Sequence, residues 1–289
     1  MHHLTLQNYL SRLRHSMASS HLWLDEQGRA RGRYFNASLT SAFQAIRSGQ
    51  DHQIVAYEAY ARSYDPGDQG LNIWKLLEYV ANDDESVELD RLCRLLHTLN
   101  FYRQQPEPGL DLYLSVHSRL LAAVEGNHGN AFRRILNTLE IPHEQIILQL
   151  PLITPSQRWV LTHVAENYRR NGFRIGVNAS SLEQAGDLLD RIRPDAIKID
   201  ISAANHAPAQ ISLLQRADQA QCNIIFRRIE NEARLLSLQQ ANDTASPYLV
   251  QGFLFDLPKA TLVGQATELP AAVSHASATV AAAGAELPG

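Results

Sequence analysis

The chain has 289 residues, of which 45% are hydrophobic, and a formal net charge of -4. This length and apolar content suffice for one large core, either a barrel or a doubly wound domain, and equally for two small domains. The acidic balance argues against non-specific binding of a nucleic acid polymer, although it leaves room for a local anion pocket. The two cysteines lie far apart in sequence, which fits a reducing compartment. No apolar run has the length to cross a bilayer, and the N-terminus lacks a signal-peptide core, so we expect a soluble, cytoplasmic protein without a membrane partner.

Residues 1–37 are predicted to form an appendage to the main domain. Amphipathic spacing predicts a helix over Leu4–Met17, and glycines indicate short strands and turns up to residue 37. Strands are predicted over 39–46 and 53–62, and leucine stripes with helical spacing predict core-facing helices over 72–81 and 87–103.

Predicted strands and helices then alternate along the chain. Short apolar strands are predicted over 110–117, 145–150, 173–178, 195–200, 222–227 and 246–252. The intervening helices are predicted over 131–139, 156–170, 182–192, 209–220 and 231–240. Short buried strands that alternate with helices favour parallel pairing, and the two earlier strands bring the number to eight. Eight such strands close a (β/α)8 barrel; an open doubly wound sheet is the alternative fold.

The strand over 53–62 carries charge on one face. Period-two alternation places Glu58, Tyr60 and Arg62 on the same side of this strand. A charged edge strand with a solvated outer face would have the same pattern.

In most of the predicted strands a polar residue follows the apolar run. These residues are Glu58, His117, Gln149, Asn178, Lys198, Asp200, Arg227 and Gln251. Because the carboxyl ends of barrel strands meet at one mouth, we expect these side chains to face a common pocket.

Several short segments, in this order and spacing, resemble the EAL family of cyclic-di-GMP phosphodiesterases over roughly Ser38–Val263. The segment YEAYAR resembles the family signature Glu-Ala-Leu-Leu-Arg, and IKID and VQGFLFDLP resemble two later motifs. The residues that match are Glu58, Ala59, Arg62, Lys198, Asp200, Gln251, Gly252 and Pro258. The resemblance implies a TIM-like barrel of the EAL type over 38–263, preceded by the appendage of 1–37.

The resemblance also implies a two-metal site, and here the chain departs from the family. Such enzymes need several anionic oxygen ligands for their two divalent cations. Glu58 matches the first ligand, but the other ligand positions are occupied by His117, Gln149, Asn178 and Ala179. In a later family segment Arg227 replaces a Glu, whereas Glu230 matches. We therefore expect no metal, no other cofactor and no hydrolysis by the family mechanism, with Glu58, Lys198 and Glu230 as remnants of the catalytic site.

The more positive mouth suggests binding without catalysis. Arg62, Lys198 and Arg227 can hold the two phosphates of cyclic-di-GMP without a metal. The resemblance implies amide hydrogen bonds from Gln44 and Gln251, and Tyr60 offers a ring for stacking. With Glu58, these residues form the predicted ligand site of an effector or regulator in bacterial signalling.

Structural roles compete with this interpretation. Lys198 and Glu58 can neutralise each other across the mouth, and Asp200 can cap the segment that follows its strand. Gln44, Gln149, Asn178 and Gln251 can form a polar layer in which every amide is hydrogen-bonded, and we prefer this role for Gln149 and Asn178.

A second function remains open, namely a nucleotide-independent scaffold that binds an unidentified protein. The loop after Asn178, NASSLEQAGDLL, lacks the glycines and aromatic residue that shape the active site and dimer contact of the family, so a homodimer is left open. An active phosphodiesterase is the least favoured alternative. From Gly264 the chain is rich in small residues, which predicts a disordered tail over 264–289.

Overall fold

The computed structural model describes residues 4–14, 21–35, 37–63, 83–118, 128–152, 154, 158–241 and 246–263. Its strands are β1 (Leu22–Leu24), β2 (Ala30–Tyr34), β3 (Ala37–Ser48), β4 (Ile54–Ser63), β5 (Asp111–Ser115), β6 (Ile146–Leu150), β7 (Arg174–Ala179), β8 (Ala196–Asp200), β9 (Asn223–Arg227) and β10 (Leu249–Gln251).

Helices alternate with the later strands along the chain. The α-helices are α1 (Leu4–Arg14), α3 (Asp83–Tyr102), α5 (His128–Thr138), α6 (Arg158–Arg170), α7 (Leu182–Ile192), α8 (Ala207–Gln219) and α9 (Glu232–Ala241). Two short 3-10 helices, η1 (His143–Gln145) and η3 (Ile201–Ala203), precede β6 and follow β8.

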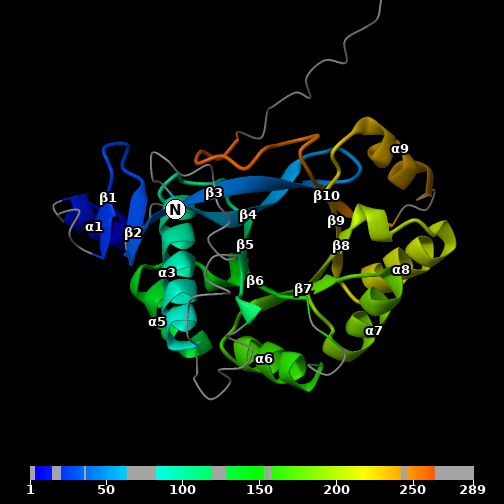
Figure 1. The fold of residues 1–289 in the computed structure, drawn as a ribbon, viewed down its shortest axis with the longest axis horizontal. Helices are drawn as coiled ribbons and strands as arrows, with labels where there is room; N and C mark the ends of the chain where they lie inside the picture. Colours follow the sequence, from blue (N-terminus) through cyan, green and yellow to red (C-terminus); the bar gives the residue numbers. More distant parts are fainter. Residues whose placement is uncertain are drawn as a thin grey trace, which may run out of the picture.

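The strands from β3 to β10 form a closed barrel. Their order is β3-β10-β9-β8-β7-β6-β5-β4, and a further pairing of β3 with β4 closes the ring. Helices surround this ring on the outside, as the view in Figure 1 shows. The predicted eight-stranded α/β barrel is therefore confirmed, and the open doubly wound sheet is wrong.

One strand does not share the parallel direction that we expected. The strand predicted over 39–46 is β3, and it runs antiparallel to both β4 and β10. The other neighbouring pairs, from β4–β5 to β9–β10, are parallel. The physical reason is the short connection over residues 49–53, because a parallel return needs a crossover of about a dozen residues or more.

Other predictions lie partly outside the described residues. The predicted helix over 72–81 and the predicted tail over 264–289 fall there completely, and the predicted N-terminal helix is described only up to Arg14. The strand predicted over 110–117 is shorter, since β5 ends at Ser115 and His117 follows it.

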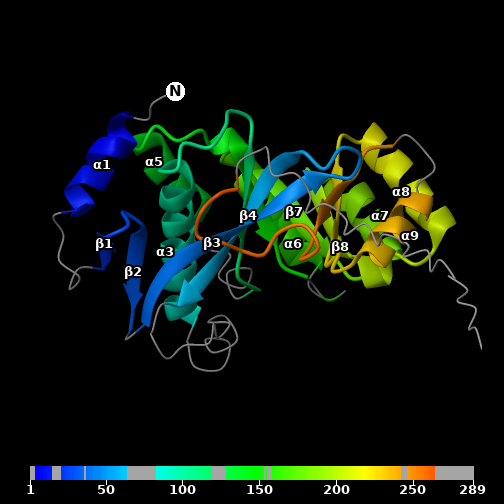
Figure 2. The same ribbon diagram turned by 90° about the horizontal axis from the view of Figure 1, so that it is seen from above.

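The N-terminal segment extends the sheet on one side of the barrel. β2 pairs with β3 and β1 pairs with β2, both antiparallel. Figures 1 and 2 show α1, β1 and β2 together beside β3 and α3. Leu6, Leu10 and Leu13 bury one face of α1 in the core between strands and helices.

A small separate core fills the barrel interior. It contains Ile46, Ala56, Tyr113, Ile147, Ala196 and Ile225, all of which are buried. Burial of each large aliphatic side chain here contributes about 1.5–3 kcal/mol to folding. Since strand side chains alternate, the inward residue two positions farther along each parallel strand lies one layer nearer the mouth.

No helix within the described residues combines the length and apolar character needed to cross a membrane.

Candidate functional site at the barrel mouth

Strand alternation brings polar side chains into the layer above the apolar interior. Glu58 follows Ala56 on β4, and Lys198 follows Ala196 on β8, each two positions beyond a residue of the inner core. β4 and β8 are four places apart in the closed ring of eight strands, so they lie on opposite sides. Lys198 therefore reaches Glu58 across the barrel.

Glu58 is the centre of a buried polar cluster. Lys198 Nζ lies 2.8 Å from Glu58 Oε2, and Tyr60 Oη and Gln251 Nε2 donate hydrogen bonds of 2.5 and 2.9 Å to the same oxygen. Gln44 Oε1 lies 3.3 Å from Tyr60 Oη, and Gln44 Nε2 donates to the carbonyl oxygen of Asp256 at 2.8 Å. Five of the predicted ligand-binding residues thus come together, in contact with one another.

The charge states in this cluster follow from burial and pairing. Burial by itself raises the pKa of Glu58, but the Lys198 ammonium and the hydrogen bonds of Tyr60 and Gln251 outweigh it, and the pKa is lowered. Burial and the Glu58 charge raise the pKa of Tyr60 well above its ordinary value, so this hydroxyl remains a donor. Glu58 is therefore ionised, and its Oε2 already has two hydrogen-bond donors and an ion-pair contact with Lys198.

Lys198 is held from two sides. Its Nζ lies 4.9 Å from the centroid of the Tyr113 ring, in addition to its contact with Glu58. Burial lowers the pKa of Lys198, assisted by Arg227, whereas Glu58 opposes the shift. The ammonium is nearly inaccessible to solvent, and its charge is balanced by Glu58.

Two arginines at the mouth keep unbalanced charge. Arg62 is half-buried and lines a pocket of about 310 Å³ with Tyr60, Ser115 and His117. Arg227 is exposed at the end of β9. Among the described residues, neither guanidinium forms an ion pair. Because their charges are not paired within this described part of the chain, Arg62 and Arg227 can bind an anion at the mouth.

Other charges near the mouth are already paired. Arg228 Nη1 lies 3.2 Å from Asp200 Oδ2, and Arg228 Nε lies 3.5 Å from Glu230 Oε1. Asp200 Oδ1 also accepts the backbone N–H of Ser202 at 3.0 Å, which confirms the predicted capping role for this residue. Glu230 is exposed and lies outside the Glu58 cluster.

Sequence patterns did not indicate every residue that lines the mouth pocket. Ser115 could have been found, because it lies on the inward face of β5 two positions after Tyr113. His97 of α3 and Pro151 also line the pocket. Nothing in the sequence connects His97 with β4, since the contact depends on how α3 packs against the barrel.

The family described as "EAL domain" matches residues 30–258 of the chain. The chain belongs to the EAL domain family.

Solved structures of EAL proteins share this fold. The Bacillus subtilis YkuI protein, in complex with substrate c-di-GMP and calcium, has a TM-score of 0.62 at 20% identity, covering 78% of this chain and 57% of that one. Klebsiella pneumoniae BlrP1, in a manganese and cy-diGMP complex, has a TM-score of 0.62 at 18% identity, covering 76% and 56%. The FimX EAL domain of Pseudomonas aeruginosa, bound to c-di-GMP, has a TM-score of 0.61 at 18% identity, covering 77% and 91%.

The EAL domain is thus related to proteins that bind c-di-GMP. The chain corresponds to little more than half the length of the YkuI and BlrP1 chains. No curated protein matches the chain at a significant level.

At the metal-ligand positions that the EAL resemblance assigns, His117, Gln149, Asn178 and Ala179 offer no carboxylate. The backbone N–H of His117 donates to Asp90 Oδ1 at 3.0 Å, and Asn178 Nδ2 donates to the carbonyl oxygen of Leu150 at 3.0 Å. Gln149 is buried, and within the described residues its amide has no hydrogen-bond partner, so the satisfied polar layer that we preferred for this residue is wrong. The side chain of Ala179 has no atom that could bind a metal.

This set of groups does not fit a pair of divalent cations. Mg²⁺, Mn²⁺ and Ca²⁺ prefer several anionic oxygen ligands, whereas Gln149 and Asn178 are neutral and Glu58 is bound to Lys198. Within the described residues there is no group of three or more His, Cys, Asp and Glu side chains arranged to hold a metal.

Proposed function

We propose that this EAL domain binds cyclic-di-GMP without metal and without hydrolysis, and passes the signal to another protein by contact. One observation carries the proposal: the carboxylate of Glu58 is bound to Lys198, Tyr60 and Gln251, while Arg62 and Arg227 have no ion-pair partner among the described residues. The mouth therefore offers cations to an anion more readily than carboxylates to a cation.

The ligand chemistry matches these two arginines. Cyclic-di-GMP carries two phosphates, and a guanidinium can bind each through paired, charge-assisted hydrogen bonds. Arg62 and Arg227 extend from β4 and β9, on either side of β3 and β10 in the ring. Gln44 and Gln251 lie at the same end, where their amides hydrogen-bond to Asp256, Tyr60 and Glu58. The Tyr60 ring offers a surface for a base.

Hydrolysis would need a base and a way to neutralise the charge that develops on the phosphoryl oxygens. Glu58 is a poor base because its pKa is lowered by Lys198 and by two hydrogen bonds, which outweigh the effect of burial. Gln149 and Asn178 cannot accept a proton at neutral pH. The described residues thus favour binding over turnover.

The test is a calorimetric titration of the full chain with cyclic-di-GMP in excess EDTA. Wild-type protein should release heat with one saturable site, and Arg62→Glu should abolish the signal because it places a carboxylate beside a phosphate. Arg170→Glu is the matched control, since Arg170 lies on α6 with a side chain 71% exposed, and it should bind like wild type. A flat titration of the wild type at high ligand concentration would contradict the proposal.

A nucleotide-independent scaffold is the second candidate, and the connection after β7 favours it. β7 ends at Ala179 and α7 begins at Leu182, capped by the Ser181 side chain, so only a tight turn joins them at the mouth. If the scaffold is correct, Arg62→Glu leaves partner binding nearly unchanged, whereas it abolishes the response of a nucleotide sensor.

A further inference from the structure

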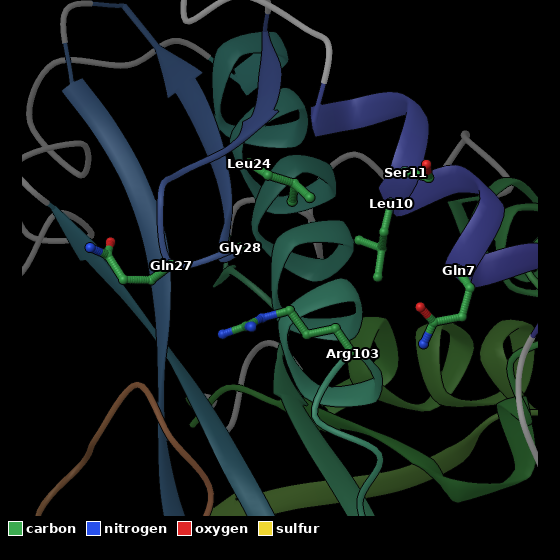
Figure 3. A pocket seen from close by; sticks show the side chains of 7 residues that line it. All are labelled: Gln7, Leu10, Ser11, Leu24, Gln27, Gly28 and Arg103. Atoms are coloured by element: carbon green, nitrogen blue, oxygen red, sulfur yellow. The ribbon is translucent and has the colours of Figure 1, made fainter.

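A second pocket lies between α1, the β1–β2 turn and the end of α3. It has a volume of about 270 Å³ and is shown in Figure 3. Its described lining residues are Gln7, Leu10, Ser11, Leu24, Gln27, Gly28 and Arg103. α3 contacts the mouth through Asp90, which binds His117, and through His97, which lines the mouth pocket. No described residue that lines the pocket at Arg103 also lines the mouth pocket, so the two pockets are separate.

The β1–β2 turn is held by one aspartate. Asp25 Oδ1 accepts the backbone N–H groups of Gln27 and Arg29 at 3.0 and 2.8 Å. Its other oxygen lies 2.8 Å from Arg29 Nε and 2.7 Å from Arg31 Nη2. Gly28 allows the turn through its positive φ of 69°. The single charge of Asp25 is thus already shared between two guanidiniums.

Arg103 brings a third guanidinium to this place. Its Nε donates to Asn100 Oδ1 at 3.1 Å, which fixes the orientation of the side chain, and Figure 3 shows it reaching toward the β1–β2 turn. Among the described residues, its terminal nitrogens have no hydrogen-bond partner. Burial lowers the pKa of Arg103, and Arg29 adds to this effect against the opposing attraction of Asp25.

The other walls supply neutral polar groups and an apolar surface. Gln7 carries a side-chain amide, and Leu10 and Leu24 add aliphatic contacts. Gln27 Oε1 accepts a hydrogen bond from Arg29 Nη2 at 3.0 Å. Of the described residues that line the pocket, Arg103 is the charged one, and none is a carboxylate. A guanidinium with unused donors, amides and an adjacent apolar wall together suit a ligand with an oxyanion and a short hydrocarbon body.

We propose that this pocket binds a small organic oxyanion, either a carboxylate or a phosphate monoester, through Arg103 with Gln7 and the apolar wall of Leu10 and Leu24. The volume lies just below the usual range of about 300–1,000 Å³ for ligand pockets and suits a single small ring. A bound molecule joins α1 to α3 and so strengthens the attachment of the N-terminal helix.

The experiment uses two probes, benzoate and phenyl phosphate, with benzyl alcohol as the uncharged analogue. Each is titrated into the full-length, ¹⁵N-labelled chain while the side-chain amide signals of Gln7 and Gln27 are followed by NMR. Saturable shifts with benzoate alone identify a carboxylate site, and shifts with phenyl phosphate alone identify a phosphate site. Shifts with both support the shared oxyanion chemistry, and benzyl alcohol should shift neither signal.

Variants separate this pocket from non-specific binding. Arg103→Gln should weaken probe binding about tenfold or more, since it removes the charge-assisted hydrogen bonds. Gln7→Ala, an exposed change on α1, gives a second variant that preserves the fold and should weaken binding severalfold. Arg170→Gln and the mouth variant Arg62→Glu should both bind the probes like wild type. Unchanged binding in Arg103→Gln and Gln7→Ala, or no saturable shift with either anion, overturns the proposal.

Discussion

At the scale of single residues, the mouth depends on the contact between Glu58 and Lys198. Their atoms lie 2.8 Å apart in a nearly dry environment. Buried ion pairs add little net stability, because desolvation of both charges offsets their attraction. Removal of one partner, in contrast, leaves the other charge buried without compensation.

The first prediction concerns this asymmetry. Lys198→Met should lower the free energy of unfolding by about 3 kcal/mol, whereas the double variant Glu58→Gln, Lys198→Met should recover most of that loss. Urea unfolding at pH 7 measures both values. A single variant within about 0.5 kcal/mol of wild type would show that the pair is not buried as described.

A second residue-scale prediction concerns His97, which lines the mouth pocket. Burial lowers its pKa from 6.5 to about 3, and its Nδ1 lies 2.8 Å from Ser41 Oγ. The native state thus keeps His97 neutral while the unfolded chain takes up a proton below pH 6.5. The stabilisation is complete above pH 6.5 and decreases as the pH falls toward 3, by about 1.4 kcal/mol per pH unit once the unfolded chain is protonated.

The check is the slope of unfolding free energy against pH between 6 and 4. His97→Asn should reduce that slope by about 1.4 kcal/mol per pH unit relative to wild type, which corresponds to one proton, because asparagine does not titrate. Equal slopes in the two proteins would mean that His97 is protonated in the folded state.

At the scale of elements, Gly252 sets how β10 meets the segment after β9. A Cβ atom at this position would lie 2.0 Å from the carbonyl oxygen of Ile229 and 2.4 Å from its nitrogen. The backbones also exchange hydrogen bonds there, from Ile229 N–H to the Gln251 carbonyl at 3.2 Å and from Leu254 N–H to the Ile229 carbonyl at 3.0 Å. This close approach holds Gln251 in reach of Glu58.

We predict that Gly252→Ala destabilises the protein by about 2 kcal/mol or more, since backbone must move to admit the methyl group. Gly186→Ala is the control. Gly186 lies inside α7, its added Cβ would meet the flexible end of Arg216 at 3.0 Å, and alanine favours a helix by about 1 kcal/mol. Thermal unfolding of both variants decides the matter, and an equal change in both would contradict the assigned role of Gly252.

At the scale of the whole molecule, the sequence predicted the barrel and its mouth but not every direction or contact. Period-two patterning placed Glu58 and Tyr60 on one face, and the structure joins them at 2.5 Å. The antiparallel β3 was missed because strand composition is the same in either direction, although the short link over 49–53 carried the information. Whether Lys198 would meet Glu58 or a ligand was left open, since that depends on a reach across the barrel that no local pattern encodes.

In the proposed function, the mouth binds cyclic-di-GMP through cations of the chain itself and does not hydrolyse it. The decisive experiment measures the dissociation constant of cyclic-di-GMP by calorimetry, once in EDTA and once in Mn²⁺. The nucleotide is then recovered from each calorimeter cell and analysed by chromatography. We predict dissociation constants equal within about twofold and intact cyclic dinucleotide in both cells. Binding that requires Mn²⁺, or the appearance of a linear dinucleotide, would contradict the claim.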